Sequence, residues 1–209
     1  MTEVKSEAIT QEVLETAYTY DQYRELIDHL LAMNKTTGEN HSEAMIHYTL
    51  MNAHRMRRLD KQIQIIPELE AQLKEINHDM VWLVLTEAWC GDAAQIIPLF
   101  NKMAELNDHI TLRLLLRDEN PDIMDEFLFR GKSRSIPVLV ALDGETLDVI
   151  GSWGPRPGEA QELFEDLRSE DDVPYQTVAE SLHKWYSADK TVSTQKELVH
   201  LIESWRRLH

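Results

Sequence analysis

The single cysteine of this 209-residue chain is the residue best placed for covalent chemistry. Cys90 follows a continuous apolar run, residues 81–86, and precedes a segment with helical periodicity, so it falls at a turn from a buried strand into a helix. A thiol at a helix N-terminus faces unpaired backbone N–H groups and the positive end of the helix dipole, and both stabilise the nucleophilic thiolate. A lone cysteine can equally be a small buried apolar residue. The sequence leaves both interpretations of Cys90 open.

Asp92, two residues after the cysteine, also bears on its reactivity. A carboxylate at this position could accept backbone N–H groups and cap the helix. It would also compete with a thiolate for the same N–H groups, and its charge would raise the pKa of the thiol. The helix N-terminus and Asp92 therefore act on the pKa of Cys90 in opposite directions.

A second candidate segment, residues 152–158, is dense in proline, glycine, tryptophan and arginine. Its two prolines would stiffen the loop, and it contains Trp153 and Arg156. The guanidinium of Arg156 can present two parallel N–H groups to a carboxylate. That carboxylate could belong to a ligand such as a glutathione-like thiol, or to Asp92 or another nearby acid of this chain. A third alternative is an arginine that is simply solvated.

Composition excludes several function classes. The 21 basic and 37 acidic residues give a net charge of −16, which argues against nucleic acid or an anionic membrane as partner. No stretch approaches the roughly 20 apolar residues of a membrane span, and residues 1–7 lack the apolar centre of an export signal, so we expect a cytoplasmic protein. One cysteine excludes an internal disulfide and a cysteine-rich zinc site.

The histidines and a local basic cluster favour ordinary structural roles. No two of the nine histidines have the i, i+4 spacing of a zinc-binding helix, so we expect neither a metal nor another cofactor. The cluster Arg55, Arg57, Arg58 and Lys61 is interpreted as an exposed helix face that pairs with acids.

The rest of the pattern predicts the elements that position these residues. An N-terminal extension, residues 1–78, is mostly helical; a central α/β domain covers 79–168; two amphipathic helices follow in 169–209. The central part has the order β-α-β-α-β-β-α, whose first two strands need a crossover and so lie parallel, and whose last two form a hairpin at Asp143-Gly144. The predicted strands are 81–86, 110–116, 137–142 and 147–152, and the predicted helices are 20–33, 42–61, 67–77, 92–107, 121–130, 157–167, 174–186 and 194–208.

Four landmarks in a fixed order carry a resemblance to a known family. They are Trp89-Cys90-Gly91 at the strand-to-helix turn, Ser135-Ile136-Pro137-Val138, the hairpin at 143–145, and Gly151 near the end of the last strand. This set resembles the thioredoxin superfamily, and within it the bacterial thioredoxin-like proteins with a helical N-terminal extension. The resemblance implies a three-layer α/β/α sandwich with a mixed sheet, here with extra N- and C-terminal helices.

The resemblance also implies a site. Pro137 would be preceded by a cis peptide bond opposite Cys90, and the Ile136 backbone would pair with an extended thiol-bearing ligand. Trp89, Gly91, Asp92 and Ala93 would surround the cysteine, and Ile136, Pro137, Trp153 and Arg156 would contact the substrate.

Two departures from the family pattern limit the chemistry. Ala93 stands where the family has its second cysteine, so Cys90 cannot close an intramolecular disulfide and thioredoxin-type dithiol reduction is not expected. Val84 stands where many thioredoxins have a buried acid that assists proton transfer.

Two function hypotheses follow, and the sequence favours the first, because the cysteine stands where a nucleophile belongs. In the first, Cys90 alone exchanges with a disulfide-bearing protein or a low-molecular-weight thiol, and an external thiol resolves the mixed disulfide. In the second, the chain is a non-catalytic thioredoxin-fold module that binds a peptide or partner through Trp89, the proline segment and the Trp153 loop. The pKa of the thiol discriminates between them, since a depressed pKa favours exchange and a normal or raised pKa favours binding.

Overall fold

Five strands form one mixed sheet in the order β1-β5-β4-β2-β3. They are β1 (Val4–Lys5), β2 (Met80–Thr86), β3 (Ile110–Leu116), β4 (Val138–Asp143) and β5 (Asp148–Trp153). β2 and β3 are parallel, and the other neighbouring strands are antiparallel. β2 occupies an interior position between β4 and β3, which explains why its sequence is a continuous apolar run.

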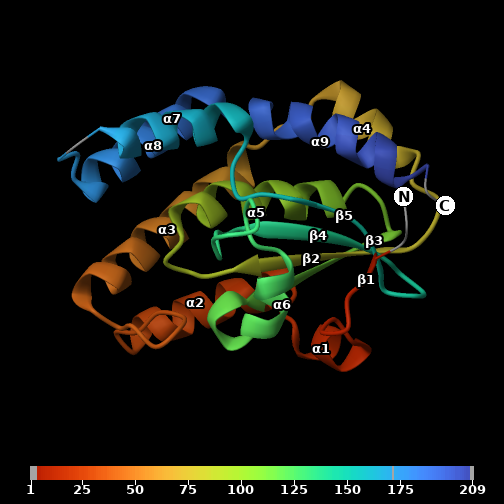
Figure 1. Cartoon of the computed structure of the whole chain (residues 1–209), viewed down its shortest axis with the longest axis horizontal. Coiled ribbons are helices and arrows are strands. Elements are labelled where there is room, and N and C mark those ends of the chain that lie inside the picture. The colour runs from red at the N-terminus through yellow and green to blue at the C-terminus, as the bar shows by residue number, and fades with distance from the viewer. Residues whose placement is uncertain (1–3, 171, 208–209) are drawn as a thin grey trace.

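Helices cover both faces of this sheet (Figure 1). α5 and the C-terminal helices lie on one side, while α1, α2 and α6 lie on the other. The helices are α1 (Gln11–Thr16), α2 (Tyr20–Ala32), α3 (Glu43–Gln62), α4 (Pro67–Lys74), α5 (Gly91–Ala104), α6 (Pro121–Glu126), α7 (Gly158–Ser169), α8 (Tyr175–Asp189) and α9 (Val192–Trp205), with a 3₁₀ turn η1 at Arg117–Glu119. The computed structural model describes residues 4–170 and 172–207. Within these residues no helix has both the length and the apolar character needed to span a bilayer.

The N-terminal helices share the hydrophobic core of the sheet. Tyr23 and Ile27 of α2 and Met56 of α3 are buried in the same cluster as the residues of β2 and α5. The hydroxyl of Tyr23 lies 3.3 Å from that of Thr86, the last residue of β2. A capping box between Thr19 and Gln22 begins α2. The amphipathic stripes of these helices are therefore buried against the α/β core.

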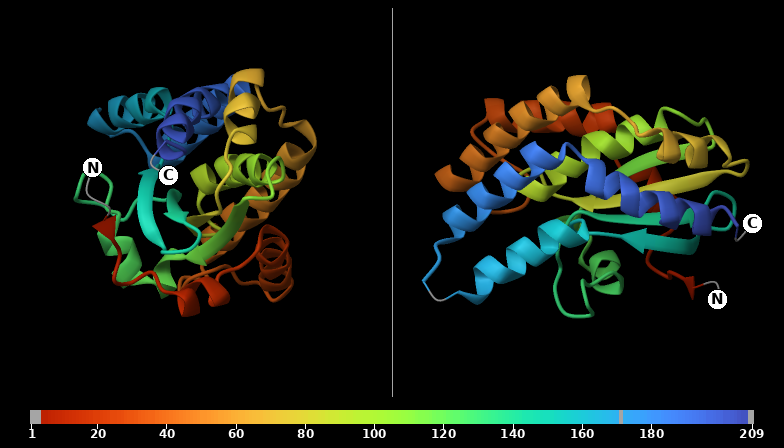
Figure 2. Two further views of the ribbon diagram at one scale, coloured as in Figure 1. Left: turned by 90° about the vertical axis from the view of Figure 1, so that its right-hand side faces the viewer. Right: turned by 90° about the horizontal axis from the view of Figure 1, so that it is seen from above.

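The C-terminal helices pack on the α5 side of the sheet. α7 and α8 form a hairpin, and α9 runs back across the sheet beside α4 (Figure 2). Trp205 of α9 contacts Gly151 of β5 so closely that any Cβ at position 151 would collide with the indole. Gly151 is thus required for this close approach of α9 to the sheet.

The structure confirms the predicted fold class and the order of the central elements, with strand boundaries shifted by at most one residue. The helix predicted to run to about residue 130 ends at Glu126, because residues 127–133 form a turn in which Arg130 and Gly131 have positive φ and Phe129 bridges Ser133. The sequence pattern missed β1, α1 and η1, which are all short. Residues 1–3 and Leu208, the predicted end of the last helix, lie outside the described residues.

Short segments lie along both edges of the sheet. β1 pairs with β5 at one edge, with Val4 opposite Val149. At the other edge, Tyr18 and Leu114 of β3 exchange two backbone hydrogen bonds of 2.8 Å.

Candidate functional site

Cys90 lies at the start of α5, immediately after the loop that follows β2. It is the N-cap residue of α5, and its side chain is 8% exposed. The peptide bond between Ile136 and Pro137 is cis, as the resemblance implies, and the Cys90 thiol donates a hydrogen bond of 3.4 Å to the Ile136 carbonyl oxygen. The cysteine and the proline segment, 47 residues apart in sequence, therefore meet as predicted.

Side chains from the N-terminal region hold the loop before Cys90. The Asn52 amide of α3 donates to the Ala88 carbonyl at 2.9 Å, and the Ala88 N–H donates to the Thr37 hydroxyl at 2.9 Å. The buried Glu87 carboxylate accepts the Asp118 N–H at 2.9 Å. Burial raises the pKa of Glu87, while its hydrogen bonds oppose that rise. The turn that presents the thiol is thus fixed by polar contacts on both sides.

A cavity of about 370 Å³ opens beside Cys90. Its size is that of a small-molecule pocket. α3 and α8 form two of its walls, and the Cys90 turn, the loop before Pro137 and Arg156 form the rest. The lining residues are Met45, Tyr48, Asn52, Arg55, Trp89, Cys90, Gly91, Asp92, Arg117, Ser133, Arg134, Ser135, Ile136, Arg156, Tyr175, Val178, Ala179, Leu182 and His183.

The environment of Cys90 favours the neutral thiol. Burial, together with the negative charge of Asp92, raises the pKa of Cys90 to about 12. The backbone N–H groups of Ala93 and Asp92 and the charge of Arg156 oppose this rise, but they do not offset it. The stabilisation expected from the helix N-terminus is present, and it is outweighed by desolvation.

Asp92 is held by two buried partners. One of its carboxylate oxygens lies 2.7 Å from the Arg156 guanidinium, and the other accepts the Tyr186 hydroxyl at 2.9 Å. Burial raises the pKa of Asp92, whereas Arg156 and Tyr186 oppose that rise. Of the three alternatives for Arg156, the structure has the internal ion pair with Asp92. The helix-cap interpretation of Asp92 is wrong, because its carboxylate oxygens face Arg156 and Tyr186.

The guanidinium of Arg156 is further fixed by the helix that follows it. Its Cζ atom lies 4.1 Å from the centroid of the Phe164 ring, and Nη1 donates to Gln161 at 3.1 Å. Both residues belong to α7, so the loop after β5 is tied to α7 and to Asp92 of α5 together.

The structure does not bring every predicted site residue to the cavity. Trp89, Gly91, Asp92, Ile136 and Arg156 line it with Cys90, whereas Ala93 and Pro137 are buried behind the lining. Trp153, predicted to contact the substrate, points elsewhere.

The orientation of Trp153 follows from its position at the end of β5. Its indole packs edge-on against Phe100 of α5, with ring centroids 5.8 Å apart, and its N–H donates to Glu197 of α9 at 2.8 Å. The side chain therefore lies on the sheet face that α5 and α9 cover, and it does not line the cavity beside Cys90.

Two walls of the cavity were missed in the sequence. Met45, Tyr48, Asn52 and Arg55 recur at helical spacing along one face of α3. Residues of α8 do the same, from Tyr175 to His183. The periodicity of both faces was available as a signal, but it does not reveal which surface each helix covers.

His183 of α8 packs directly on the Cys90 turn, against Gly91. A Cβ at Gly91 would lie 2.7 Å from the imidazole Cε1 atom. Burial and the nearby charge of Arg55 lower the pKa of His183 to about 4, so the imidazole is neutral at pH 7.

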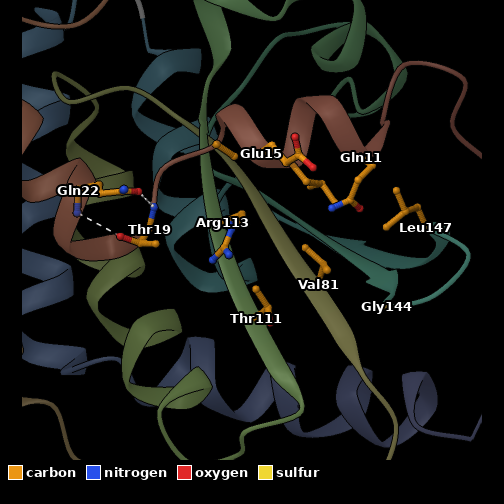
Figure 3. Close-up of a pocket in the computed structure, with 11 residues that line it drawn as sticks. Gln11, Glu15, Thr19, Gln22, Val81, Thr111, Arg113, Gly144 and Leu147 are labelled. Carbon is orange, nitrogen blue, oxygen red and sulfur yellow. Dashed lines mark hydrogen bonds between the residues drawn. The ribbon is translucent and has the colours of Figure 1, made fainter.

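A second cavity, of about 340 Å³, lies between α1 and residues of β2, β3 and the β4–β5 hairpin (Figure 3). Among its polar residues, Thr19 and Gln22 are bonded to each other in the capping box of α2. It contains no nucleophilic thiol, since Cys90 lines the other cavity. The cavity beside Cys90 is therefore the candidate functional site.

A comparison with family models decides the family of this chain. The thioredoxin model matches residues 38–168, well over half of the sequence. The chain belongs to the thioredoxin family. The match begins upstream of α3 and ends in α7. It therefore includes Cys90, Pro137 and the wall of the cavity that α3 forms.

Solved structures share the thioredoxin-family fold of the whole chain. A protein of unknown function from Pseudomonas aeruginosa has a TM-score of 0.59 at 16% identity, and the alignment covers 96% of this chain and 98% of that one. The crystal structure of an HIV epitope-scaffold has a TM-score of 0.58 at 16% identity, with 92% and 96% covered. No curated protein matches the chain in a sequence comparison.

Proposed function

We propose that this thioredoxin-family protein is a binding module whose cavity beside Cys90 takes a ligand, and that Cys90 contributes a neutral thiol to that cavity. The observation that carries the proposal is the position of Cys90: its thiol is almost fully buried, donates to the Ile136 carbonyl, and lies beside the buried charge of Asp92. Such a thiol is a hydrogen-bond donor at pH 7.

The magnitude of the pKa shift supports binding over exchange. With a pKa of about 12, roughly one thiol in 10⁵ is ionised at pH 7, compared with a few per cent of an ordinary cysteine. Only the thiolate attacks a disulfide. The resting protein would therefore hold about a thousandfold less thiolate than an ordinary thiol, which slows exchange even though a thiolate of higher pKa is the better nucleophile.

The experiment is the alkylation rate of Cys90 by iodoacetamide as a function of pH, followed by mass spectrometry. We expect the rate of the native protein to be still rising above pH 10, whereas the denatured protein follows an ordinary thiol titration. A native rate that reaches its plateau near or below pH 8 would overturn the binding proposal.

Monothiol exchange is the second candidate, and one observation favours it. The backbone N–H groups at the start of α5 and the Arg156 guanidinium all act to lower the pKa of Cys90, so a ligand that shields Asp92 would shift the balance towards the thiolate. The thiolate would then attack a disulfide, forming one S–S bond as the leaving thiolate departs, and an external thiol would release Cys90 by the same reaction.

Incubation with glutathione disulfide tests this second candidate. A mixed disulfide on Cys90 of the native protein at pH 7, reversed by excess reduced glutathione, would support exchange. If Cys90 is modified only after denaturation, monothiol exchange is refuted and the binding module remains the proposed function.

A further inference from the structure

Basic residues outnumber acidic residues in the lining of the cavity beside Cys90, although the protein as a whole carries −16. Four arginines line it, at positions 55, 117, 134 and 156, and Asp92 is the acid among the lining residues. With His183 neutral at pH 7, the lining has an excess of basic charge. A local charge opposite in sign to the net charge indicates a preference for anionic ligands at this place.

Three of these arginines already have carboxylate partners. Arg156 pairs with Asp92, Arg117 lies 2.7 Å from Asp118, and Arg134 binds Asp125 through two hydrogen bonds of 2.7 Å. The carboxylate partners offset the charges of these three arginines and engage most of their donors.

Arg55 differs from the other three. Its Nη1 atom donates to the Asn52 amide oxygen at 2.7 Å, and Asn52 in turn donates to the Ala88 carbonyl in the loop before Cys90. Within residues 4–170 and 172–207, no carboxylate forms an ion pair with Arg55. The guanidinium is thus half-buried, positioned by a neutral group, and lacks a counter-ion.

Apolar and aromatic side chains make up much of the remaining lining, together with the polar residues Asn52, Ser133, Ser135 and His183. Met45 and Tyr48 of α3, Ile136, and Val178 and Leu182 of α8 contribute side chains to the same cavity. A small hydrated anion would leave this surface without a partner, whereas an apolar group attached to the anion would cover it.

We propose that the cavity binds an organic anion with an apolar body, and that Arg55 is the counter-ion of its acidic group. This inference rests on the proposed function as a binding module and names the class of its ligand. The acidic group, a carboxylate or a sulfonate, accepts hydrogen bonds from the free N–H groups of Arg55, and the apolar body lies between α3 and α8. The ligand supplies the missing counter-charge, so its binding is favoured over that of a neutral molecule of the same shape.

Two fluorescent probes that differ in one acidic group test the inference. Anilinonaphthalene sulfonate has an apolar body and a sulfonate, and N-phenyl-1-naphthylamine has the same ring system without it. Each is titrated against the full-length protein and against Arg55→Gln, with Arg57→Gln as the matched control. Arg57 lies two residues further along α3, is exposed, and pairs with Asp28.

We expect one sulfonate probe to bind per chain, about tenfold or more tightly than the neutral probe. Arg55→Gln removes this preference, so that the two probes bind with similar affinity, whereas Arg57→Gln keeps the preference. Arg55→Lys retains the charge and keeps most of the preference. The comparison of the two probes on the unaltered protein requires no variant, so it stands even where a substitution impairs folding.

Other outcomes separate the inference from the function on which it rests. Equal binding of the two probes, unaffected by Arg55→Gln, would overturn the anion inference and leave the binding module in place. If neither probe binds to the native protein, the proposed function is contradicted as well.

Discussion

The carboxylate of Asp92 and the guanidinium of Arg156 form a buried ion pair, 2.7 Å between the nearest atoms, directly beside the Cys90 turn. The pair connects the first turn of α5 to the loop that follows β5. Its two charges act on the Cys90 thiol in opposite directions, and the acid has the larger effect. Burial has the largest effect on the pKa of Cys90, and Asp92 and Arg156 modify that effect in opposite directions.

Removal of the Asp92 charge should make Cys90 more reactive. In Asp92→Asn the thiol loses the carboxylate that raises its pKa and keeps Arg156, which lowers it. We expect the pKa of Cys90 to fall and the alkylation rate at pH 8 to rise about threefold to tenfold. Asp28→Asn, which removes an exposed acid of α2 from its pair with Arg57, is the control and should leave the rate unchanged. A slower or unaltered rate in Asp92→Asn would contradict this assignment.

Tyr186→Phe should destabilise the fold. The hydroxyl donates to Asp92 in a buried environment, so its removal leaves a carboxylate oxygen without that partner. The expected loss is about 1–3 kcal/mol in the free energy of unfolding, measured by urea denaturation. Tyr175→Phe, at an exposed residue at the start of the same helix, should cost far less. Equal effects of the two substitutions would show that the Asp92 contact contributes little.

His183 should make the protein acid-sensitive. Its pKa is about 4 in the folded state, compared with 6.5 for an ordinary histidine, so the unfolded chain binds a proton that the native state does not accept. Stability is therefore highest above pH 6.5 and is lost as the pH falls from 6.5 towards 4. Denaturation at pH 7.5 and pH 5 should show a smaller loss for His183→Gln than for the unaltered protein. His54→Gln, at an exposed histidine of α3, should behave like the unaltered protein, and a similar loss in all three would refute the assignment.

Gly154 should tolerate no side chain. It has a φ of +142°, and a Cβ there would collide with the carbonyl oxygen of Pro137, a backbone atom that cannot rotate away. We expect Gly154→Ala to lower the free energy of unfolding by about 2 kcal/mol or more. Gly131→Ala is the control that measures the backbone strain of a positive φ without a steric collision. Gly131 has a φ of +68°, but a Cβ there would meet no atom within 4 Å. The prediction fails if the two variants are equally stable.

A cysteine at position 93 should restore a dithiol. Positions 90 and 93 are the N-cap and third residue of α5, one helical turn apart. We expect Ala93→Cys to lose two hydrogens on mild oxidation, detected by intact mass and by loss of both free thiols. Ala93→Ser, of similar size, should keep its single thiol under the same conditions. Two free thiols after oxidation of the native variant would indicate that the turn cannot bring them together.

The strands were predictable because each has a local signal, whereas the meeting of Cys90 and Pro137 was implied by the resemblance to the thioredoxin superfamily. β2 is a continuous apolar run, the hairpin has Asp143-Gly144 at its turn, and Cys90 falls where that run ends. Such patterns depend on residues close together in sequence. They therefore fix the central elements and the spacing between them.

The walls of the cavity depend on contacts between distant segments. Arg55 was interpreted as part of an exposed basic face, yet it lies in the cavity because Asn52, one turn earlier, bonds the loop at Ala88. Trp153 was expected near the substrate, yet its indole faces Phe100 and Glu197. In both cases the direction of the side chain is decided by which helix packs on which surface, and periodicity alone does not contain that information.

The short segments that pair with β5 and β3 have a consequence for the behaviour of the protein at high concentration. Val4–Lys5 occupies hydrogen-bonding positions of β5, and Tyr18 occupies those of Leu114 in β3. Unpaired outer strands are templates on which chains add to one another and grow into fibrils. Because Val4–Lys5 and Tyr18 already pair with part of β5 and β3, addition of another chain at these positions is hindered as long as residues 4–18 stay docked, and the protein should resist amyloid-like aggregation under the same condition.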